Sequence, residues 1–295
     1  MPVPTTVVVL DAVRADGIAR CVEALLRHTD DGVPLLVGGD QHAALEAAKL
    51  LDAAGRRHDR TAGMGGALIA EAHSAHPHEH VAYISGDTEV TAGWVDSLVS
   101  AARDDAQVAS VTPLSNAAAF LTVPKRNLPW PTLGIETPDG AAAALRDAGE
   151  PLLPRIPCAL AHCVLLTAGA LDLVGPPPTD QPDRGEALAA WSANATGRGL
   201  VHVAADGLYV GHRPEPEPWG LGEWPRDAGQ AMLSAVTEAA EDRHSALSRS
   251  LLRAAVTLEP LAVTVDARCL GGDQLTGTSL HVIELLGAIS AREDL

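Results

Sequence analysis

The sequence predicts an α/β protein whose central sheet is mostly parallel and covered by helices. Short β-branched runs alternate with segments of helical apolar spacing through the first ~115 residues, which is typical of such a sheet. Hydrophobic residues make up 46% of the 295 residues, too many for a disordered chain. Because aromatic residues are only 3%, the core must consist mainly of Ala, Val and Leu.

The N-terminal half supplies the clearest elements. Thr6–Leu10 is a continuous β-branched run, as in strands buried on both faces, and Gly17–His28 has the apolar spacing of a helix. The same reasoning predicts strands at Val33–Val37, Val81–Ser85 and Val108–Thr112, and helices at Ala43–Ala54, Gly65–His76 and Trp94–Arg103.

The second half is less regular. Residues 113–155 are rich in Pro and Gly and predict a long irregular connection, of the kind that is usually functional or mobile. Beyond it we expect strands at Ala159–Leu166, Leu200–Ala204 and Leu208–His212, helices at Ala168–Val174 and Glu186–Gly197, and a long amphipathic helix at about 227–253. The Pro-rich loop between the last two elements carries Trp219 and Trp224, which either cover a site or pack against the sheet edge.

The C-terminal tail predicts a separate unit. Leu261–Asp266 is a fresh strand and Thr278–Ala291 a fresh helix, joined by a Gly-rich loop. We therefore expect one domain over 1–255 and the truncated beginning of a second over 256–295. The alternative is a final βα unit that completes the first sheet.

Charge and cysteine content exclude some classes of protein. The formal net charge is −17, which argues against nucleic-acid binding and against docking to an anionic membrane through a basic patch. The four cysteines form no C-x-x-C pair, and no window approaches 18 apolar residues. We expect a cytoplasmic protein with no transmembrane segment and no nucleic-acid partner.

Asp87 is the strongest candidate for chemistry in the chain. It follows a predicted central strand in Y-I-S-G-D-T-E, at the edge where open α/β sheets bind ligands. A carboxylate there, with Glu89 two residues on, can hold a hard cation. The alternative is a solvated turn.

The segment 85–121 resembles family 2 glycosyltransferases of the GT-A fold. It reads SGDTEVTAGWVDSLVSAARDDAQVASVTPLSNAAAFL, which is similar to the family's D-x-D, T-E-V-x-x-G-W and P-L-S-N motifs, and the resemblance extends from residue 6 to about 213. It implies a GT-A-like nucleotide-diphospho-sugar transferase fold. Asp87 is then the last acid of the metal motif, and Ser85 takes the place of the first.

The same resemblance implies where the donor would bind. Gly38 and Gly39 occupy the positions of acids that contact the nucleoside in the family, and Asp40 stands one or two positions later as a substitute. The turn at 61–67 looks like the family's Gly-containing entry to a helix, whose amides would face a pyrophosphate. The implied donor-binding set is Asp11, Asp40, Gly65, Gly66, Ser85, Gly86 and Asp87.

On the acceptor side, Glu186 matches the family's catalytic carboxylate, with Gly185 where a preceding Glu would be. An inverting transfer needs one such base to take the proton of the acceptor hydroxyl. Asp183 is the alternative base, and a purely structural role for Glu186 beside the helix dipole stays open. His212 matches the family's late His, which with Asp87 would bind Mg²⁺ or Mn²⁺.

Two further features stay open. The tail from Ala262, with its V-T-V-D-A-R and T-G-T motifs, resembles the opening of a family 4 glycosyltransferase of the GT-B fold. The run H-x-x-H-x-H-x-H at His73, His76, His78 and His80 has conceivable metal-ligand spacing, or is a solvated surface.

The functional prediction is an inverting, metal-assisted glycosyltransferase. It would use a nucleotide-sugar donor and an acceptor that is a glycan, a lipid-linked molecule or a small molecule. The alternative is a degenerate GT-A domain that binds a sugar or positions a partner, since Ser85, Gly38, Gly39 and Gly185 stand where acids are expected. A nucleotidyltransferase is less favoured because Asp11–Gly17 lacks a Gly-rich basic loop.

Overall fold

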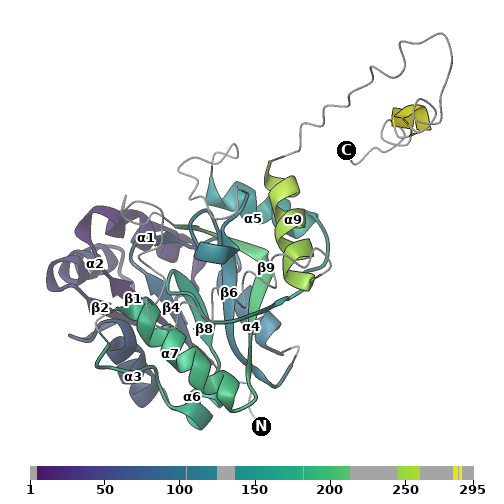
Figure 1. Cartoon of the computed structure of the whole chain (residues 1–295). Coiled ribbons are helices and arrows are strands. Elements are labelled where there is room, and N and C mark those ends of the chain that lie inside the picture. The colour runs from purple at the N-terminus through teal and green to yellow at the C-terminus, as the bar shows by residue number, and fades with distance from the viewer. Residues whose placement is uncertain are drawn as a thin grey trace. The chain divides into compact units, whose positions relative to one another are not determined.

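The computed structural model describes 5–103, 105–124, 137–181, 183–212, 245–259, 282–284 and 286–287. The chain divides into two compact units, Met1–Glu259 and Pro260–Leu295. Figure 1 shows the first unit with its helices and strands labelled. The strand expected at Leu261–Asp266 and most of the helix expected at Thr278–Ala291 lie outside the described residues, as does the tail motif of the second resemblance.

The first four strands form the parallel half of the sheet. β1 (Thr6–Ala12) pairs in parallel with β2 (Leu35–Gly39) and with β4 (His80–Ser85), and β3 (Asp59–Arg60) extends the edge beside β2. Because these strands run the same way, the ends of β1, β2 and β4 meet at one edge, where Asp11 lies opposite both Gly38 and Ser85.

The remaining strands make the sheet mixed. β8 (Cys163–Leu166) runs antiparallel between β4 and β6 (Val108–Ser115), and β9 (Val201–His212) is parallel to β6. The short strands β5 (Thr88–Glu89) and β7 (Arg155–Ile156) pair antiparallel with β9. The strand order is β3-β2-β1-β4-β8-β6-β9-β5, so the mostly parallel sheet predicted from the sequence is confirmed.

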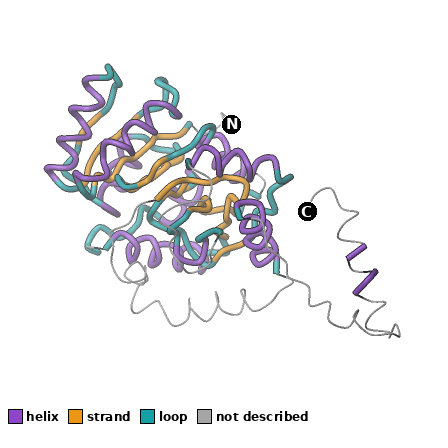
Figure 2. The backbone as a smooth tube through the Cα atoms, turned by 90° about the horizontal axis from the view of Figure 1, so that it is seen from above, coloured by secondary structure: helices purple, strands orange, loops and turns teal. Residues whose placement is uncertain are grey.

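Helices cover both faces of this sheet (Figure 2). α1 (Ala15–His28), α2 (Gln41–Ala53) and α4 (Trp94–Arg103) pack on one face, and α3 (Gly65–Ala75), α6 (Ala168–Val174) and α7 (Arg184–Gly197) on the other. Side chains of β1 alternate between the two layers, with Val8 and Leu10 in the first and Val7 and Val9 in the second. This explains why β1 is a continuous apolar run.

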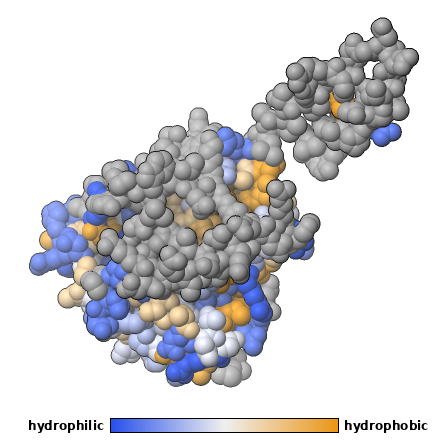
Figure 3. Space-filling model, viewed as in Figure 1, coloured by the Kyte–Doolittle hydropathy of each residue, from blue (hydrophilic) through white to orange (hydrophobic). Residues whose placement is uncertain are grey.

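A third apolar cluster lies beyond β9. It contains residues of α5 (Pro138–Asp147), α9 (Ala246–Leu258) and the 3₁₀ turn Ala119–Leu121. Hydrophobic side chains also gather on the surface over α9 (Figure 3), where Leu252 is 61% exposed. No helix among the described residues is long and apolar enough to cross a membrane.

Three predictions about the elements between residues 113 and 212 are wrong. The irregular stretch expected at 113–155 contains the end of β6 and all of α5, which Thr137 caps by accepting a hydrogen bond from the Gly140 amide. The two strands expected at Leu200–Ala204 and Leu208–His212 are one strand, β9, with an irregularity in its pairing to β6 between them. The strand expected from Ala159 begins only at Cys163.

The single long helix expected at about 227–253 is also wrong in the part that the structure describes, because the chain is extended at Ser245. Residues 213–244, which include Trp219 and Trp224, lie outside the described part of the chain. α9 begins at Ala246, where Ser245 caps it through the Ser248 amide, and it continues past the expected end to Leu258.

Candidate functional site

Asp87 and His212 lie together at the edge where β4 ends. β5 starts directly after Asp87 and pairs antiparallel with the end of β9, which sets Thr88 opposite His212. Both side chains are buried, with Asp87 9% exposed and His212 1% exposed. The pairing of β5 with β9 therefore brings together two residues that are far apart in the sequence.

The carboxylate of Asp87 is held in its ionised form. His212 Nε2 lies 3.3 Å from Asp87 Oδ1, and the Ser85 hydroxyl donates to the same oxygen at 2.5 Å. Burial alone would raise the pKa of Asp87, but the hydrogen bond and charge of His212, then Ser85 and Arg184, hold it below its usual value. Ser85, where the sequence resemblance implied the first acid of a metal motif, thus donates a hydrogen bond to the second acid, Asp87.

The ring of His212 has a fixed orientation. Its Nδ1 lies 2.5 Å from the carbonyl oxygen of Ala117, and because a carbonyl only accepts, Nδ1 carries the proton. Nε2 then faces the carboxylate of Asp87. The neighbouring ring of His162 is centred 5.6 Å away, and burial, then the charge of His212, lowers the pKa of His162 to about 3, so that it is neutral.

Asp11 is buried beside this pair. Its Oδ2 accepts from the Tyr83 hydroxyl at 2.6 Å and from the Gly65 amide at 3.0 Å. Its Oδ1 is buried and has no hydrogen-bond partner among the described residues. Burial, then the charge of Asp11, raises the pKa of Tyr83 well above its usual value, so Tyr83 remains a donor. Asp11 and Gly65, both predicted to bind the nucleotide sugar, are therefore joined by a hydrogen bond.

The glycines around Asp11 are packed against backbone. A Cβ at Gly66 would lie 2.1 Å from the Pro178 oxygen, and one at Gly86 would lie 3.0 Å from Ala12 Cα. At Gly38 a Cβ would lie 2.4 Å from the Gly63 oxygen, and at Gly39, with φ at +107°, 2.5 Å from the Ala12 oxygen. Neither end position of β2 has room for the carboxylate that the family resemblance leads one to expect.

Asp40 caps a helix. Its Oδ1 accepts from the amides of His42 and Ala43, both at 3.0 Å, and begins α2. The side chain is exposed, and it lies on the chain directly after Gly39 at the same edge of the sheet. The carboxylate of Asp40 thus accepts hydrogen bonds from amides in the first turn of α2 that have no partner within the helix.

The first turn of α7 holds both base candidates. Asp183 is its N-cap and accepts from the Glu186 amide at 2.9 Å. Glu186 is half-buried, and its carboxylate has no hydrogen bond or ion pair within the described chain. This turn contacts the beginning of α3, since a Cβ at Gly65 would lie 3.4 Å from Arg184 Cβ.

Sequence reasoning missed Arg184. The guanidinium of Arg184 acts electrostatically on both Asp87 and Tyr83: it helps to lower the pKa of Asp87 and partly opposes the rise in the pKa of Tyr83. The signal was a basic residue at the start of the helix that carries Glu186. Glu89, expected as a possible cation ligand, instead forms an ion pair with Arg20 on α1 at 3.4 Å.

The histidine run does not assemble a metal site. His78 and His73 both face Asp172, at 2.9 Å and 3.9 Å, whereas His80 points inward and accepts from the Ala168 amide. Across the described ranges, no group of three or more His, Cys, Asp or Glu side chains is arranged to hold a metal ion. Asp87 and His212 are a pair, which can bind a cation only with further ligands.

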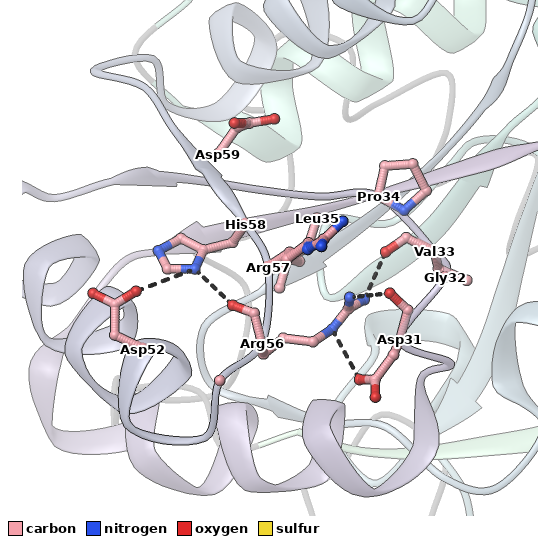
Figure 4. Close-up of a pocket in the computed structure, with 11 residues that line it drawn as sticks. Asp31, Gly32, Val33, Pro34, Leu35, Asp52, Arg56, Arg57, His58 and Asp59 are labelled. Carbon is pink, nitrogen blue, oxygen red and sulfur yellow. Dashed lines mark hydrogen bonds and ion pairs between the residues drawn. The ribbon is translucent and has the colours of Figure 1, made fainter.

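A cavity of about 680 Å³ lies elsewhere, at the start of β2 (Figure 4). Arg56 spans its wall and donates to the carbonyls of Asp30, Asp31 and Val33, which ties the loop before β2 to the end of α2. Because Gly38 and Gly39 are at the other end of the same strand, this cavity is at the opposite edge of the sheet from Asp87.

No family model matches the chain, and no curated protein matches it. Among solved structures it is similar to the mannosyltransferase PcManGT from Pyrobaculum calidifontis in complex with GDP-Man and Mn²⁺ (14% identity, TM-score 0.49, 98% of this chain and 81% of that one). It is also similar to glucosyl-3-phosphoglycerate synthase from Mycobacterium tuberculosis in complex with Mg²⁺ and UDP (16% identity, TM-score 0.44, 72% of this chain and 73% of that one).

A third similar structure is GalNAc-T7 with UDP, GalNAc and Mn²⁺. It has 15% identity and a TM-score of 0.50, covering 85% of this chain and 56% of that one. At such identity the likeness shows the fold alone. The chain has an α/β fold of the GT-A type, the fold of nucleotide-sugar transferases.

Proposed function

We propose that the chain transfers a sugar from a nucleotide-diphosphate sugar to an acceptor hydroxyl with the assistance of a divalent cation. The observation that carries this proposal is the Asp87–His212 pair. An ionised carboxylate oxygen and an imidazole nitrogen that is the acceptor in its neutral form lie 3.3 Å apart at the ligand-binding edge of the sheet. A positive charge satisfies this facing pair, either as a proton on His212 Nε2 or as a bound cation.

The two side chains fit Mg²⁺ or Mn²⁺ as a site that the substrate completes. Both cations accept carboxylate oxygen, and Mg²⁺ is usually bound by only one or two carboxylates, together with water and substrate phosphates. GalNAc-T7, the solved structure that supports the fold, contains UDP and Mn²⁺. When bound at Asp87 and His212, such a cation would neutralise the negative charge of the departing diphosphate.

The chain's own residues provide the remaining parts. Glu186 has an unengaged carboxylate in the first turn of α7, so it is our general base for the acceptor hydroxyl, whereas Asp183 is occupied as the helix cap. Direct attack by that hydroxyl inverts the anomeric centre. Arg184, in the same turn, adds positive charge near Asp87.

The proposal is tested by calorimetry with UDP-, GDP- and dTDP-sugars, with and without Mn²⁺. We expect one donor class to bind, with an affinity that falls on Asp87→Asn in the presence of Mn²⁺ and changes little without it, because only the ionised carboxylate holds the cation. Asp96→Asn, on the first turn of α4, is a matched control. No binding of any donor class to the wild type would overturn the proposal.

A second candidate is a GT-A domain that binds a donor without transferring the sugar. It is favoured by Gly38 and Gly39, where packing leaves no room for a side chain, and by the neutral residues Ser85 and Gly185. Glu186→Gln separates the two candidates. For an enzyme, turnover, including slow donor hydrolysis, should fall about 10²–10⁴-fold with donor affinity retained. For a binding domain, wild type and variant should be equally inactive.

A further inference from the structure

We infer that Asn116 is a positioning residue that presents the imidazole of His212 to the cation site. The inference rests on the proposed function, because it concerns the same pair of ligands. It starts from the backbone of His212, which is held on one side by β5 and on the other by a single side chain.

That side chain is Asn116, directly after the last residue of β6. Its Nδ2 donates to the His212 carbonyl at 2.7 Å, and its Oδ1 accepts from the His212 amide at 2.8 Å. The β6–β9 ladder ends with Ser115 opposite Val210. The amide of Asn116 therefore continues the pairing beyond the last backbone partners and satisfies both backbone groups of His212.

The next residue fixes the ring. The Ala117 carbonyl accepts the proton of His212 Nδ1 at 2.5 Å, which leaves Nε2 directed at Asp87 Oδ1, 3.3 Å away. Asn116 and Ala117 thus form one turn that sets the backbone position, the ring plane and the tautomer of His212. Carbonyl partners such as that of Ala117 orient metal-binding histidines, and loss of this orientation typically lowers metal affinity 10–100-fold.

A merely structural role for Asn116 makes a different prediction. Asn116 is half-buried, so a strand end without it could be solvated and would leave the ring of His212 in place through Ala117. On our inference the ring moves when the amide is removed, because the backbone that carries it is no longer fixed.

The test compares wild type, Asn116→Ala and the milder Asn116→Ser with Asn194→Ala, an exposed control on α7. The first readout is the ¹⁵N NMR signature of the His212 ring, assigned by comparison with His212→Gln. Wild type and control should show a single form with Nδ1 protonated, and the Asn116 variants a mixture of tautomers. The second is Mn²⁺ affinity by electron paramagnetic resonance with the metal alone, which should fall 10–100-fold in Asn116→Ala and less in Asn116→Ser.

The two readouts keep the inference and the proposed function apart. An unchanged ring signature and unchanged Mn²⁺ affinity in folded Asn116 variants would overturn the inference. Wild-type protein that binds no Mn²⁺, with or without UDP, GDP or dTDP, while the ring signature still depends on Asn116, would overturn the metal-assisted function and leave the positioning of His212 established.

Discussion

The glycines at the end of β2 are fixed by what surrounds them. The space beside Gly38 is filled by the Gly63 carbonyl and by Leu68, whose Cδ1 would lie 2.7 Å from a Cβ. Gly39 has a φ of +107°, a conformation that side chains with a Cβ rarely adopt. The absence of acids at these two positions is therefore part of the packing between β1, β2 and α3.

At this scale we predict the result of restoring an acid. Gly38→Asp should destabilise the protein by about 1–3 kcal/mol, because the new side chain meets backbone that cannot move aside, and it should bring no gain in donor affinity. Urea unfolding and calorimetry measure the two effects. Gly169→Ala, in α6 where an added Cβ meets nothing within 4 Å, is the matched control and should be neutral or slightly stabilising. A Gly38→Asp variant of full stability that binds donor more tightly would contradict this account.

At the scale of the element, β9 is stabilised at the point where its pairing to β6 shifts. Asp206, 1% exposed, accepts from the amides of Leu152 and Leu153 and binds Ser250 and Arg253 of α9. One carboxylate therefore joins the strand, the loop before β7 and the last helix of the first unit.

Removing that carboxylate should loosen α9. Asp206→Asn keeps the shape of the side chain but replaces an accepting oxygen by an NH₂ group that faces other hydrogen-bond donors. We therefore expect the free energy of unfolding, measured in urea, to fall by about 2–4 kcal/mol. Amide hydrogen exchange should show the loss of protection concentrated in α9 and 150–153. Asp105→Asn, whose partner Arg155 is largely exposed, is the control and should change stability by less than about 1 kcal/mol. A uniform loss of hydrogen-exchange protection across all strands would instead indicate that Asp206 has no special link to α9.

The order of elements could be predicted from the sequence where apolar periodicity is strong. Trp94–Arg103 and Ala168–Val174 have the predicted bounds, and the β1 run is buried on both faces. Periodicity could not reveal that β8 is antiparallel between β4 and β6, since strand direction depends on tertiary pairing. The sequence pattern also predicts a break in β9 at Asp206 and Gly207, because a polar residue followed by a glycine is typical of a turn.

For the site, sequence motifs indicate the positions of the residues but not their contacts. Asp87 and His212 were chosen from motifs, and the structure brings them to 3.3 Å. The bonds of Asp11 to Gly65 and Tyr83, and of Asn116 to His212, join residues from separate elements, so no local pattern contains them. Arg184 was missed for the same reason.

At the scale of the whole molecule, buried histidines couple stability to pH. His202 is 1% exposed, its Nε2 faces the Ser192 carbonyl, and its Nδ1 accepts from the Ser110 hydroxyl. Burial lowers the pKa of His202, and burial and then Arg103 lower the pKa of His80. Both rings are therefore neutral in the folded chain and take up a proton more readily when it unfolds.

It follows that acid should destabilise the fold before any carboxylate is protonated. Stability from these rings is complete above the unfolded pKa, about 6.5, and is lost as pH falls from there toward the lower folded pKa, by at most about 1.4 kcal/mol per pH unit for each ring. Urea unfolding at pH 7.5, 6.5 and 5.5 measures the slope. His202→Gln should be less stable at pH 7.5 but show a flatter dependence, and an equally steep slope would contradict the assignment to His202.

The close packing around Gly38 and Gly39 also has an evolutionary consequence. An acid at either position would have to be accompanied by a change at Leu68 or in the turn around Gly63, because the space is taken by those groups. Any route to a carboxylate at the end of β2 therefore passes through an intermediate in which the new side chain clashes with these groups. Selection against destabilising single substitutions would therefore preserve these glycines independently of any activity of the chain.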